Sequence, residues 1–245
     1  MKITFLILAL VLGCSSDKPK GRTEAESLFK EAQELMESER YILATEKLNL
    51  IKTQHPYSFY ATPAELLQAD VLFLQENYIE AAAAYLLFRD FHPKHEKIPF
   101  VVFRIAESYF KQIPATIDRD LEPAMESIKY YEEVVQKYST SSYKRKAGER
   151  IRSAKKMLRE KDVYIADFYF RTKEFSAARY WYLDILESHR DQFTQSHAMV
   201  RTILATHALK EWQPCLDYVE KYYDSVEKGA KKEIKLVKDN CIKKQ

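Results

Sequence analysis

The 245-residue chain contains only 4 glycines, and its 39 lysines and arginines against 36 aspartates and glutamates give a formal net charge of +3. So few glycines exclude folds that need positive φ angles or close backbone approach at fixed places, such as a dinucleotide-binding turn, a phosphate-binding P-loop or a many-hairpin β-barrel. The nearly balanced charge does not favour nucleic acid as a partner. With 17 tyrosines and 13 phenylalanines, aromatic rings must fill much of the core.

Residues 1–13 are typical of a signal peptide. Lys2 precedes an apolar run over residues 3–12 that is too short to span a bilayer as a helix. The segment ends in Val11-Leu12-Gly13-Cys14, which resembles the lipobox of bacterial lipoproteins. We therefore expect residues 1–13 to be removed and Cys14 to become the lipidated N-terminus. The serine after Cys14 favours sorting to the outer membrane.

Residues 14–22 are expected to tether a folded body, residues 23–245, to the periplasmic face of that membrane. The eight residues after Cys14 read SSDKPKGR, a polar segment with one proline and one glycine. Fully extended, eight residues reach at most about 28 Å. No later segment has 18 consecutive apolar residues, so the body is not expected to cross the membrane.

A 37-residue step relates several positions in the first half of the body. Small, aromatic and proline residues share it: Ala32, Ala69 and Ala106; Tyr41 and Tyr78; Ala44 and Ala81; Pro56 and Pro93. Within each unit a 3-4-3 spacing places four residues on one helical face, and similar faces follow at 127–134, 175–185 and 212–222. This pattern is typical of tetratricopeptide helix pairs, whose usual period is about 34 residues. It predicts an all-α, right-handed α-solenoid of five tetratricopeptide-like helix pairs plus a C-terminal helix.

Two segments interrupt the regular pattern. Residues 111–123 form a longer connection inside the third pair, and residues 143–171 are predicted to be one long helix. The first half of that helix is strongly basic. It is either a solvated face or a docking surface for an acidic partner, and both interpretations remain open.

The chain carries no recognisable catalytic or metal-binding motif. His92 and His95 flank Pro93, which prevents a metal-binding pair on one helical face. HExxH, GxSxG and paired cysteine ligands are absent from the sequence. We therefore interpret the protein as non-enzymatic, with no cofactor and no metal site.

The first helix of each pair is expected to line the inner face of the solenoid. Counting from the repeated alanines, the outward-facing positions form an apolar ladder beside a polar row. The ladder consists of Phe29, Met36, Leu66, Phe73, Phe103 and Phe110, and the polar row includes Asp70 and Glu107. The ladder is either a groove for an extended peptide with aromatic residues or buried packing against the next pair.

Cys215 and Cys241 are the cysteines that remain once Cys14 carries lipid. The last helix is predicted to fold back on its predecessor through a turn near residues 225–229. In an antiparallel helix pair, facing residues are equally far from the turn. The midpoint between Cys215 and Cys241 is residue 228, inside the predicted turn, so the two cysteines should face each other. An oxidising compartment favours a disulfide, which requires Cα atoms within about 7 Å. Two separate buried thiols are the alternative.

Several local segments resemble one family of outer-membrane lipoproteins. The segment His55-Pro56-Tyr57-Ser58-Phe59-Tyr60 resembles the family's proline-aromatic turn after the first pair. Phe103-Arg104-Ile105-Ala106 resembles its Tyr-x-Arg-Gly segment, and Ala166-Asp167-Phe168-Tyr169 resembles its Ala-x-Phe-Tyr segment. Over roughly residues 14–225 the chain thus resembles the BamD family of outer-membrane protein assembly factors.

The resemblance implies a scaffold of the outer-membrane β-barrel assembly complex. Its partners would be the POTRA domains of the barrel insertase, other lipoproteins of the complex and unfolded outer-membrane proteins. The family's docking arginine on the second helix of the fourth pair is Trp181 here, with Arg179 nearby, and Arg150 on the basic helix is a further docking candidate. The alternative function is a lipoprotein scaffold of another envelope machine, in secretin or pilus assembly or in a cell-wall complex.

Overall fold

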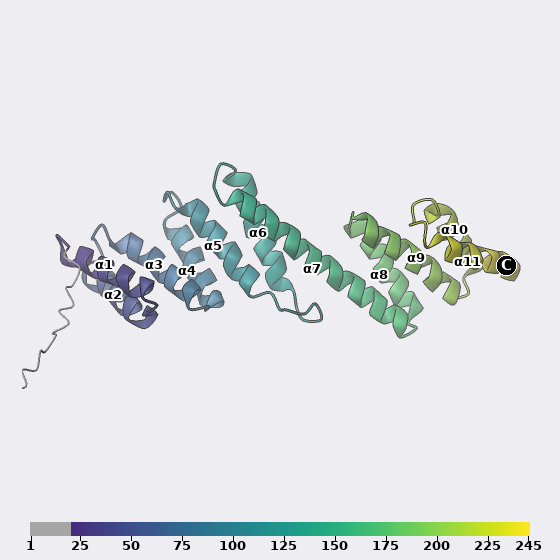
Figure 1. Ribbon diagram of the computed structural model, residues 1–245, viewed down its shortest axis with the longest axis horizontal. Coiled ribbons are helices and arrows are strands. Elements are labelled where there is room, and N and C mark those ends of the chain that lie inside the picture. The colour runs from purple at the N-terminus through teal and green to yellow at the C-terminus, as the bar shows by residue number, and fades with distance from the viewer. Residues whose placement is uncertain (1–20) are drawn as a thin grey trace, which may run out of the picture. The chain divides into compact units, whose positions relative to one another are not determined.

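The computed structural model describes residues 21–245, so the expected signal peptide and Cys14 lie outside the described part. Residues 21–245 contain helices and no strand (Figure 1). The helices are α1 (Glu24–Glu37), α2 (Tyr41–Gln54), α3 (Ala61–Leu74), α4 (Tyr78–Phe91), α5 (Ile98–Lys111), α6 (Glu122–Lys137), α7 (Lys144–Arg171), α8 (Phe175–Ser188), α9 (Gln192–Ala208), α10 (Trp212–Tyr222) and α11 (Lys231–Lys244). The predicted five helix pairs and C-terminal helix are confirmed.

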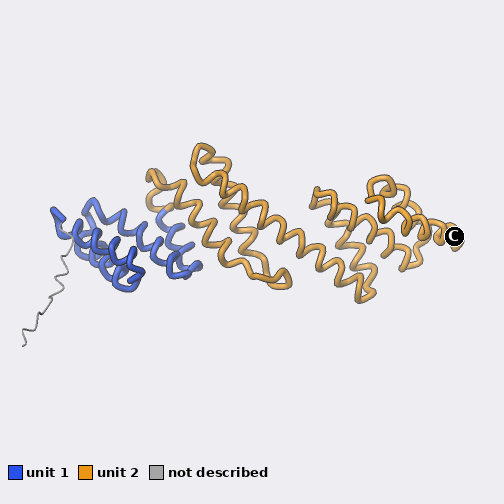
Figure 2. The backbone as a smooth tube through the Cα atoms, viewed as in Figure 1, with its two compact units in different colours: residues 1–88 blue, residues 89–245 orange. Residues whose placement is uncertain are grey.

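The chain divides into two compact units, residues 1–88 and residues 89–245 (Figure 2). In the first unit α1 packs on α2 and α2 packs on α3. In the second unit each helix from α5 to α10 packs on the next one, and there are further contacts of α7 with α5, of α7 with α9 and of α11 with α9. Each unit therefore buries its helix faces against neighbours along the chain, as a tetratricopeptide-like array requires.

Small residues lie where the two helices of a pair cross. In the first pair Ala32 and Ala44 are fully buried, and Leu48 and Ile51 on α2 are fully buried beside them. The same position on the later second helices is taken by Ala81, Ser127, Ala178 and Cys215, which are also fully buried. A larger side chain there would force the helices apart, because protein interiors have little free space.

Left-handed residues end the first helix in four of the five pairs. Glu39, Glu76, Lys173 and Lys210 have φ angles of 58°, 62°, 67° and 60°. In the first pair the Arg40 N–H donates to the Leu35 carbonyl at 2.8 Å, which closes the helix in a Schellman motif. These turns use residues other than glycine despite the steric cost, and this explains how a repeat array forms from a chain with 4 glycines.

The C-terminal helix is joined to its neighbour by a disulfide. Cys215 on α10 and Cys241 on α11 are bonded, with their Cα atoms 6.7 Å apart. Both side chains are fully buried in a cluster with Ile203, Val219 and Ile234. The Cα–Cα distance lies within the limit of about 7 Å that a disulfide requires. The bond joins residues that are 26 positions apart at the end of the array.

We predict that the disulfide stabilises this end of the second unit. Replacing both cysteines with alanine should lower the free energy of unfolding by about 3 kcal/mol, because the unfolded chain regains the entropy of an open loop. Urea unfolding followed by circular dichroism measures this change, and a reductant should destabilise the parent protein but not the double variant. Two titratable thiols at Cys215 and Cys241 in denatured, unreduced protein would contradict the prediction.

Candidate protein-binding surface

A tyrosine on the second helix of a pair donates a hydrogen bond to a carboxylate on the first helix. The three tyrosines are fully buried, so each hydroxyl needs an acceptor inside the protein. The bonds join Tyr85 to Asp70, Tyr131 to Glu107 and Tyr182 to Asp167, the last at 2.6 Å. The second, third and fourth pairs therefore share one polar contact between their two helices.

The two partners of this contact are present together or absent together. At the corresponding positions, the first pair has Leu48 with Gln33 and the fifth pair has Val219 with Leu204. Leu48 and Val219 carry no hydroxyl, and no carboxylate stands at the position opposite them. Removing both partners leaves no unsatisfied polar group, whereas removing one would leave a buried group without its hydrogen bond.

Glu107 is also paired with cations from the next helix pair. Its carboxylate lies 3.0 Å from Arg150 Nε and 3.2 Å from Lys146 Nζ, both on α7. Burial raises the pKa of Glu107, but the hydrogen bond from Tyr131 and the charges of Arg150 and Lys146 outweigh it, so the pKa lies below its ordinary value. The Arg150 guanidinium also lies 4.4 Å from the centre of the Phe110 ring.

Asp167 forms the corresponding network in the fourth pair. Its Oδ1 accepts from Tyr182 and lies 2.8 Å from His197 Nε2 on α9. Burial raises the pKa of Asp167, while the contacts with His197 and Tyr182 and the charge of Arg201 lower it below the ordinary value. In both networks the first helix of the following pair supplies a further partner, namely Lys146 and Arg150 on α7 or His197 on α9, so each network ties three helices together.

The structure interrupts the predicted apolar ladder. Leu66 and Phe103 are each only 4% exposed, so their assignment as outward-facing groove residues is wrong. The ring of Phe103 stacks on Tyr143 at 4.9 Å, because the segment leading into α7 covers this part of α5. The remaining ladder residues, Phe29, Met36, Phe73 and Phe110, are partly exposed.

The polar row is occupied by contacts within the protein. Glu107 is 4% exposed and held by Tyr131 and two cations, and Asp70 accepts a hydrogen bond from Tyr85. The expectation of a polar row open to a peptide is therefore wrong at Glu107. Burial of Glu107 has the same cause as that of Phe103, because α7 lies over α5.

The predicted docking residues are engaged within the second unit. Arg150 pairs with Glu107, and Arg179 on α8 donates to both carboxylate oxygens of Glu211, with NH2 at 3.3 Å. Trp181 packs against the buried cluster around Ala178. The structure places Arg179 and Trp181 close together on α8 and Arg150 in the first half of α7.

Ion pairs also neutralise much of the basic half of α7. The pairs are Arg145 with Glu149, Lys146 with Glu107, Lys155 with Glu132, Lys156 with Glu160 and Arg159 with Asp191. These carboxylates belong to the same unit, so they lower the net positive charge that an acidic partner would meet. The contacts favour a solvated face over a docking surface.

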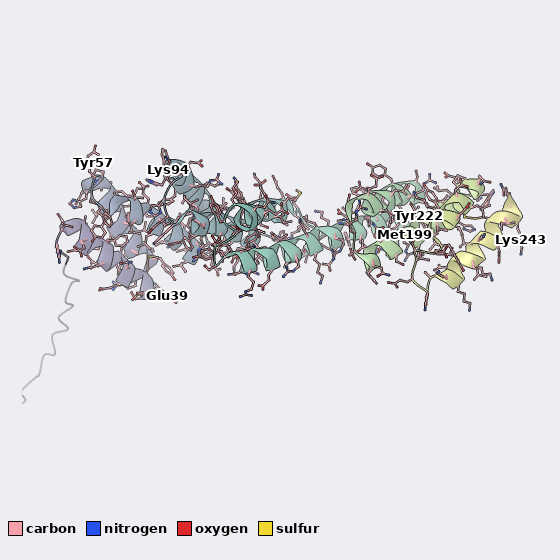
Figure 3. The ribbon with its side chains drawn as sticks, turned by 90° about the horizontal axis from the view of Figure 1, so that it is seen from above. Glu39, Tyr57, Lys94, Met199, Tyr222 and Lys243 are labelled. Atoms are coloured by element: carbon pink, nitrogen blue, oxygen red, sulfur yellow. A yellow bond between two sulfur atoms is a disulfide. The ribbon has the colours of Figure 1, made fainter. Side chains whose placement is uncertain are left out.

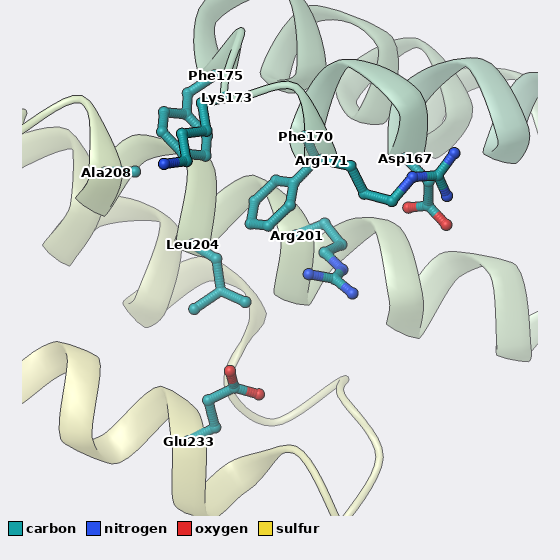
Figure 4. Close-up of a pocket in the computed structure, with 9 residues that line it drawn as sticks. All are labelled: Asp167, Phe170, Arg171, Lys173, Phe175, Arg201, Leu204, Ala208 and Glu233. Carbon is teal, nitrogen blue, oxygen red and sulfur yellow. The ribbon is translucent and has the colours of Figure 1, made fainter.

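An open pocket of about 560 Å³ lies in the second unit between the end of α7, the start of α8, α9 and α11. Its lining, drawn in Figure 4, comprises Asp167, Phe170, Arg171, Lys173, Phe175, Arg201, Leu204, Ala208 and Glu233. The Arg201 guanidinium lies 4.6 Å from the centre of the Phe170 ring, and Figure 4 shows the two side chains next to each other. A hollow of about 250 Å³ shares Arg201, Leu204 and Glu233 with this pocket.

The pocket combines apolar walls with charged side chains of both signs, the cations Arg171, Lys173 and Arg201 and the carboxylates Asp167 and Glu233. Phe170, Phe175 and Leu204 offer apolar surface, and Arg201 offers a planar donor whose stacking on Phe170 holds it in place. This chemistry suits a protein segment with an apolar side chain beside a carboxylate. The pocket could not be predicted from the sequence, because Arg201 on α9 meets Phe170 on α7 only in the folded unit. The sequence offers one signal, Leu204. It is apolar, whereas the corresponding position is acidic in three pairs and is Gln33 in the first pair.

Within residues 21–245 no group of three or more histidine, cysteine, aspartate or glutamate side chains is placed to hold a metal ion. None of the described helices is long and apolar enough to cross a membrane.

Comparison with known families agrees with this architecture. A family model described as outer membrane lipoprotein, YfiO, matches residues 22–220. The chain belongs to this family. The match spans all five helix pairs except the last residues of α10, and so includes the Phe170–Arg201 pocket apart from Glu233.

Relatives in the YfiO family are similar to the chain over most of its length. A protein of Rickettsia prowazekii named outer membrane protein assembly factor BamD is 27% identical over 211 residues, covering 83% of this chain and 84% of the relative. The protein of the same name from Vibrio cholerae is 27% identical over 188 residues, covering 71% of this chain and 76% of the relative.

Two solved tetratricopeptide structures are distantly similar to the chain. The TPR2AB-domain:pHSP90 complex of yeast Sti1 has a TM-score of 0.43 at 15% identity, covering 89% of this chain and 98% of that one. A tetratricopeptide repeat protein from Parabacteroides merdae has a TM-score of 0.29 at 13% identity, with the same coverage. The family assignment rests on the sequence match.

We predict that the tyrosine–carboxylate contact stabilises the second unit. Replacing Tyr182 with phenylalanine should lower the free energy of unfolding by about 1–3 kcal/mol, because Asp167 loses a donor inside the protein. The matched control is Tyr180→Phe on the same helix, where the ring is 68% exposed and the change should stay within about 0.5 kcal/mol. Equal effects in urea unfolding would contradict the prediction.

We also predict acid sensitivity from the lowered pKa values of Glu107 and Asp167. A carboxyl whose pKa is lower in the folded state stabilises the fold above its ordinary pKa, and this contribution is lost as the pH falls through the folded-state value. The free energy of unfolding should therefore fall from about pH 5 downward. Urea titrations should show a shallower fall for Glu107→Gln than for the exposed control Glu220→Gln, and identical slopes would argue against it.

Proposed function

We propose that the protein is a non-enzymatic scaffold of the outer-membrane β-barrel assembly complex. The observation that carries the proposal is the family match over residues 22–220, together with relatives named outer membrane protein assembly factor. In this proposal lipid on Cys14 anchors the protein to the periplasmic face of the outer membrane. The scaffold helps to recognise and insert unfolded outer-membrane proteins.

The architecture suits such a role on physical grounds. An array of helix pairs presents an extended surface on which side chains from several helices can contact one partner. Partly exposed Phe29, Met36, Phe73 and Phe110 give the first and second units aromatic and apolar surface that an unfolded substrate segment can use. We assign substrate contacts to these residues and no longer to Leu66, Phe103 or Glu107.

We propose further that the Phe170–Arg201 pocket receives a side chain of the POTRA-containing insertase. Among the arginines considered, Arg150 and Arg179 are already paired with Glu107 and Glu211. Arg201 has its guanidinium on Phe170 at the pocket and is partly exposed there. A partner carboxylate can therefore reach Arg201 without breaking an existing ion pair, and breaking a buried pair is costly.

Purification of the tagged lipoprotein from its own membranes tests this proposal. We expect a POTRA-containing barrel protein to co-purify with it and Arg201→Glu to reduce the recovered amount about tenfold or more, because loss of a buried charge pair costs at least 2 kcal/mol. The control is Arg152→Glu on the basic half of α7, which should retain the partner. Thermal melting of each variant, and the milder Arg201→Gln, separate loss of docking from loss of folding.

The outcomes distinguish the alternatives. Loss with Arg152→Glu and not with Arg201→Glu would move docking to the basic face of α7. Recovery of secretin, pilus or cell-wall components without a barrel insertase would favour the second candidate function, a scaffold of another envelope machine. Either result would overturn the corresponding part of the proposal.

A further inference from the structure

The turn between the first and second helix pairs exposes two aromatic side chains. Tyr57 is fully exposed and Phe59 is 85% exposed, although both belong to an ordered turn. Its backbone is held where the His55 N–H donates to Ile51 at 2.9 Å and the Ser58 N–H donates to His55 at 3.0 Å. Figure 3 shows Tyr57 projecting from the edge of its unit, away from the helices. We call residues 55–60 the aromatic turn.

The internal repeat shows that helix packing does not require these rings. Thirty-seven residues later, Tyr57 and Phe59 correspond to Lys94 and Glu96, which are both exposed in the turn after α4. The two turns are otherwise alike, since His92-Pro93 corresponds to His55-Pro56. Exposed aromatic rings at these two positions are therefore a special property of the first turn, and a repeat unit folds with charged residues in their place.

The aromatic turn lies beside the residue at which the tether enters the folded body. His55 Nε2 is 3.5 Å from Glu24 in the first turn of α1, and the Tyr60 ring packs on Phe29 of α1 at 5.4 Å. The start of α1 is itself fixed, because Glu26 Oε2 accepts from the Arg22 N–H at 2.9 Å. Chain entry and exposed rings therefore share one end of the first helix pair.

We propose that the aromatic turn inserts Tyr57 and Phe59 into the interface of the membrane to which the lipid on Cys14 is anchored. This inference rests on the lipid anchor of the proposed function. Eight residues after Cys14 span at most about 28 Å, so the turn stays within reach of the lipid headgroups. A short tether gives an effective concentration of about millimolar, at which a weak second contact becomes populated.

The chemistry of the turn and of the tether fits a lipid surface. Tyrosine places an apolar ring below the headgroups and keeps its hydroxyl in water, which is why aromatic residues gather at membrane interfaces. Lys18, Lys20 and Arg22 in the adjoining sequence attract anionic headgroups. Lipid and aromatic turn together make a two-point attachment, which sets the orientation of the first unit toward the membrane.

Depth-dependent quenching in reconstituted vesicles tests the proposal. The full lipoprotein is reconstituted into vesicles of phosphatidylethanolamine and phosphatidylglycerol that contain a spin-labelled phospholipid. An environment-sensitive fluorophore is attached at Phe59→Cys or, as the matched control, at Glu96→Cys on the corresponding turn. Labelling without reductant leaves the Cys215–Cys241 disulfide intact. We expect quenching and a blue-shifted emission at position 59 and neither at position 96.

A second measurement uses the residues of the other turn. The double substitution Tyr57→Lys and Phe59→Glu should keep the fold, because the same residues occupy the corresponding turn. In the unlipidated Cys14→Ala protein it should lower the weak partitioning onto these vesicles about tenfold or more, since two rings no longer leave water. Unchanged helicity and melting temperature show that the loss is not caused by unfolding.

Vesicle flotation separates failure of this inference from failure of the anchor. If the Cys14 lipoprotein does not float with vesicles, the lipid anchor itself is wrong. If it floats and position 59 is not quenched, or is quenched no more than position 96, the membrane contact of the aromatic turn is overturned. Protection of position 59 only when a purified barrel insertase is added would assign the turn to a protein partner and would equally overturn the proposal.

Discussion

The need to satisfy buried tyrosine hydroxyls determines how neighbouring helices of this protein are coupled. A tyrosine fills the large space below the small residue of a helix crossing, but its hydroxyl must then find an acceptor. Asp167 meets this need for Tyr182, and its Oδ1 also contacts His197 from the next pair. One choice of core residue is thus matched by a carboxylate on the adjoining helix and, for Glu107 and Asp167, by a further partner on the helix after it. The polar contacts thereby fix the register between successive pairs, which apolar packing alone leaves loosely specified.

The proposed docking pocket lies beside the fifth pair, which lacks the tyrosine–carboxylate contact. In the fifth pair Val219 replaces the tyrosine, so no carboxylate is needed opposite it and Leu204 takes that position. Leu204 lines the pocket together with Phe170, and the Arg201 guanidinium lies over the Phe170 ring. The pocket lies between the fourth and fifth pairs, where α7, α8, α9 and α11 meet. Side chains from four helices can therefore contact one partner there.

The sequence predicted which helix faces are buried but not which neighbour covers the remaining ones. The 37-residue step and the 3-4-3 spacing located all five pairs, because they report packing inside a pair. The sequence pattern assigns Phe103 and Glu107 to an open face, yet Tyr143 and the first turns of α7 lie over α5 and help to bury both. The sequence leaves open whether the cations of α7 form a solvated face or a docking surface, and carboxylates from outside α7 pair with Lys146, Lys155 and Arg159 in the folded unit. Contacts between pairs depend on how far one pair is rotated against the next. The periodicity within a single helix carries no information about that rotation.

Departures from the internal repeat are the clearest sign of function in this chain. The repeat supplies its own control, because corresponding positions meet the same packing requirement in each pair. Leu204 departs from the acid that three pairs carry and shapes a pocket, while Tyr57 and Phe59 depart from Lys94 and Glu96 and expose aromatic rings. Neither change is needed to bury a helix, so folding stability gives no reason for it. The exposed aromatic pair beside the entry of a short tether and the apolar wall at the last pair are therefore the two places where we propose that something outside the folded chain covers the surface.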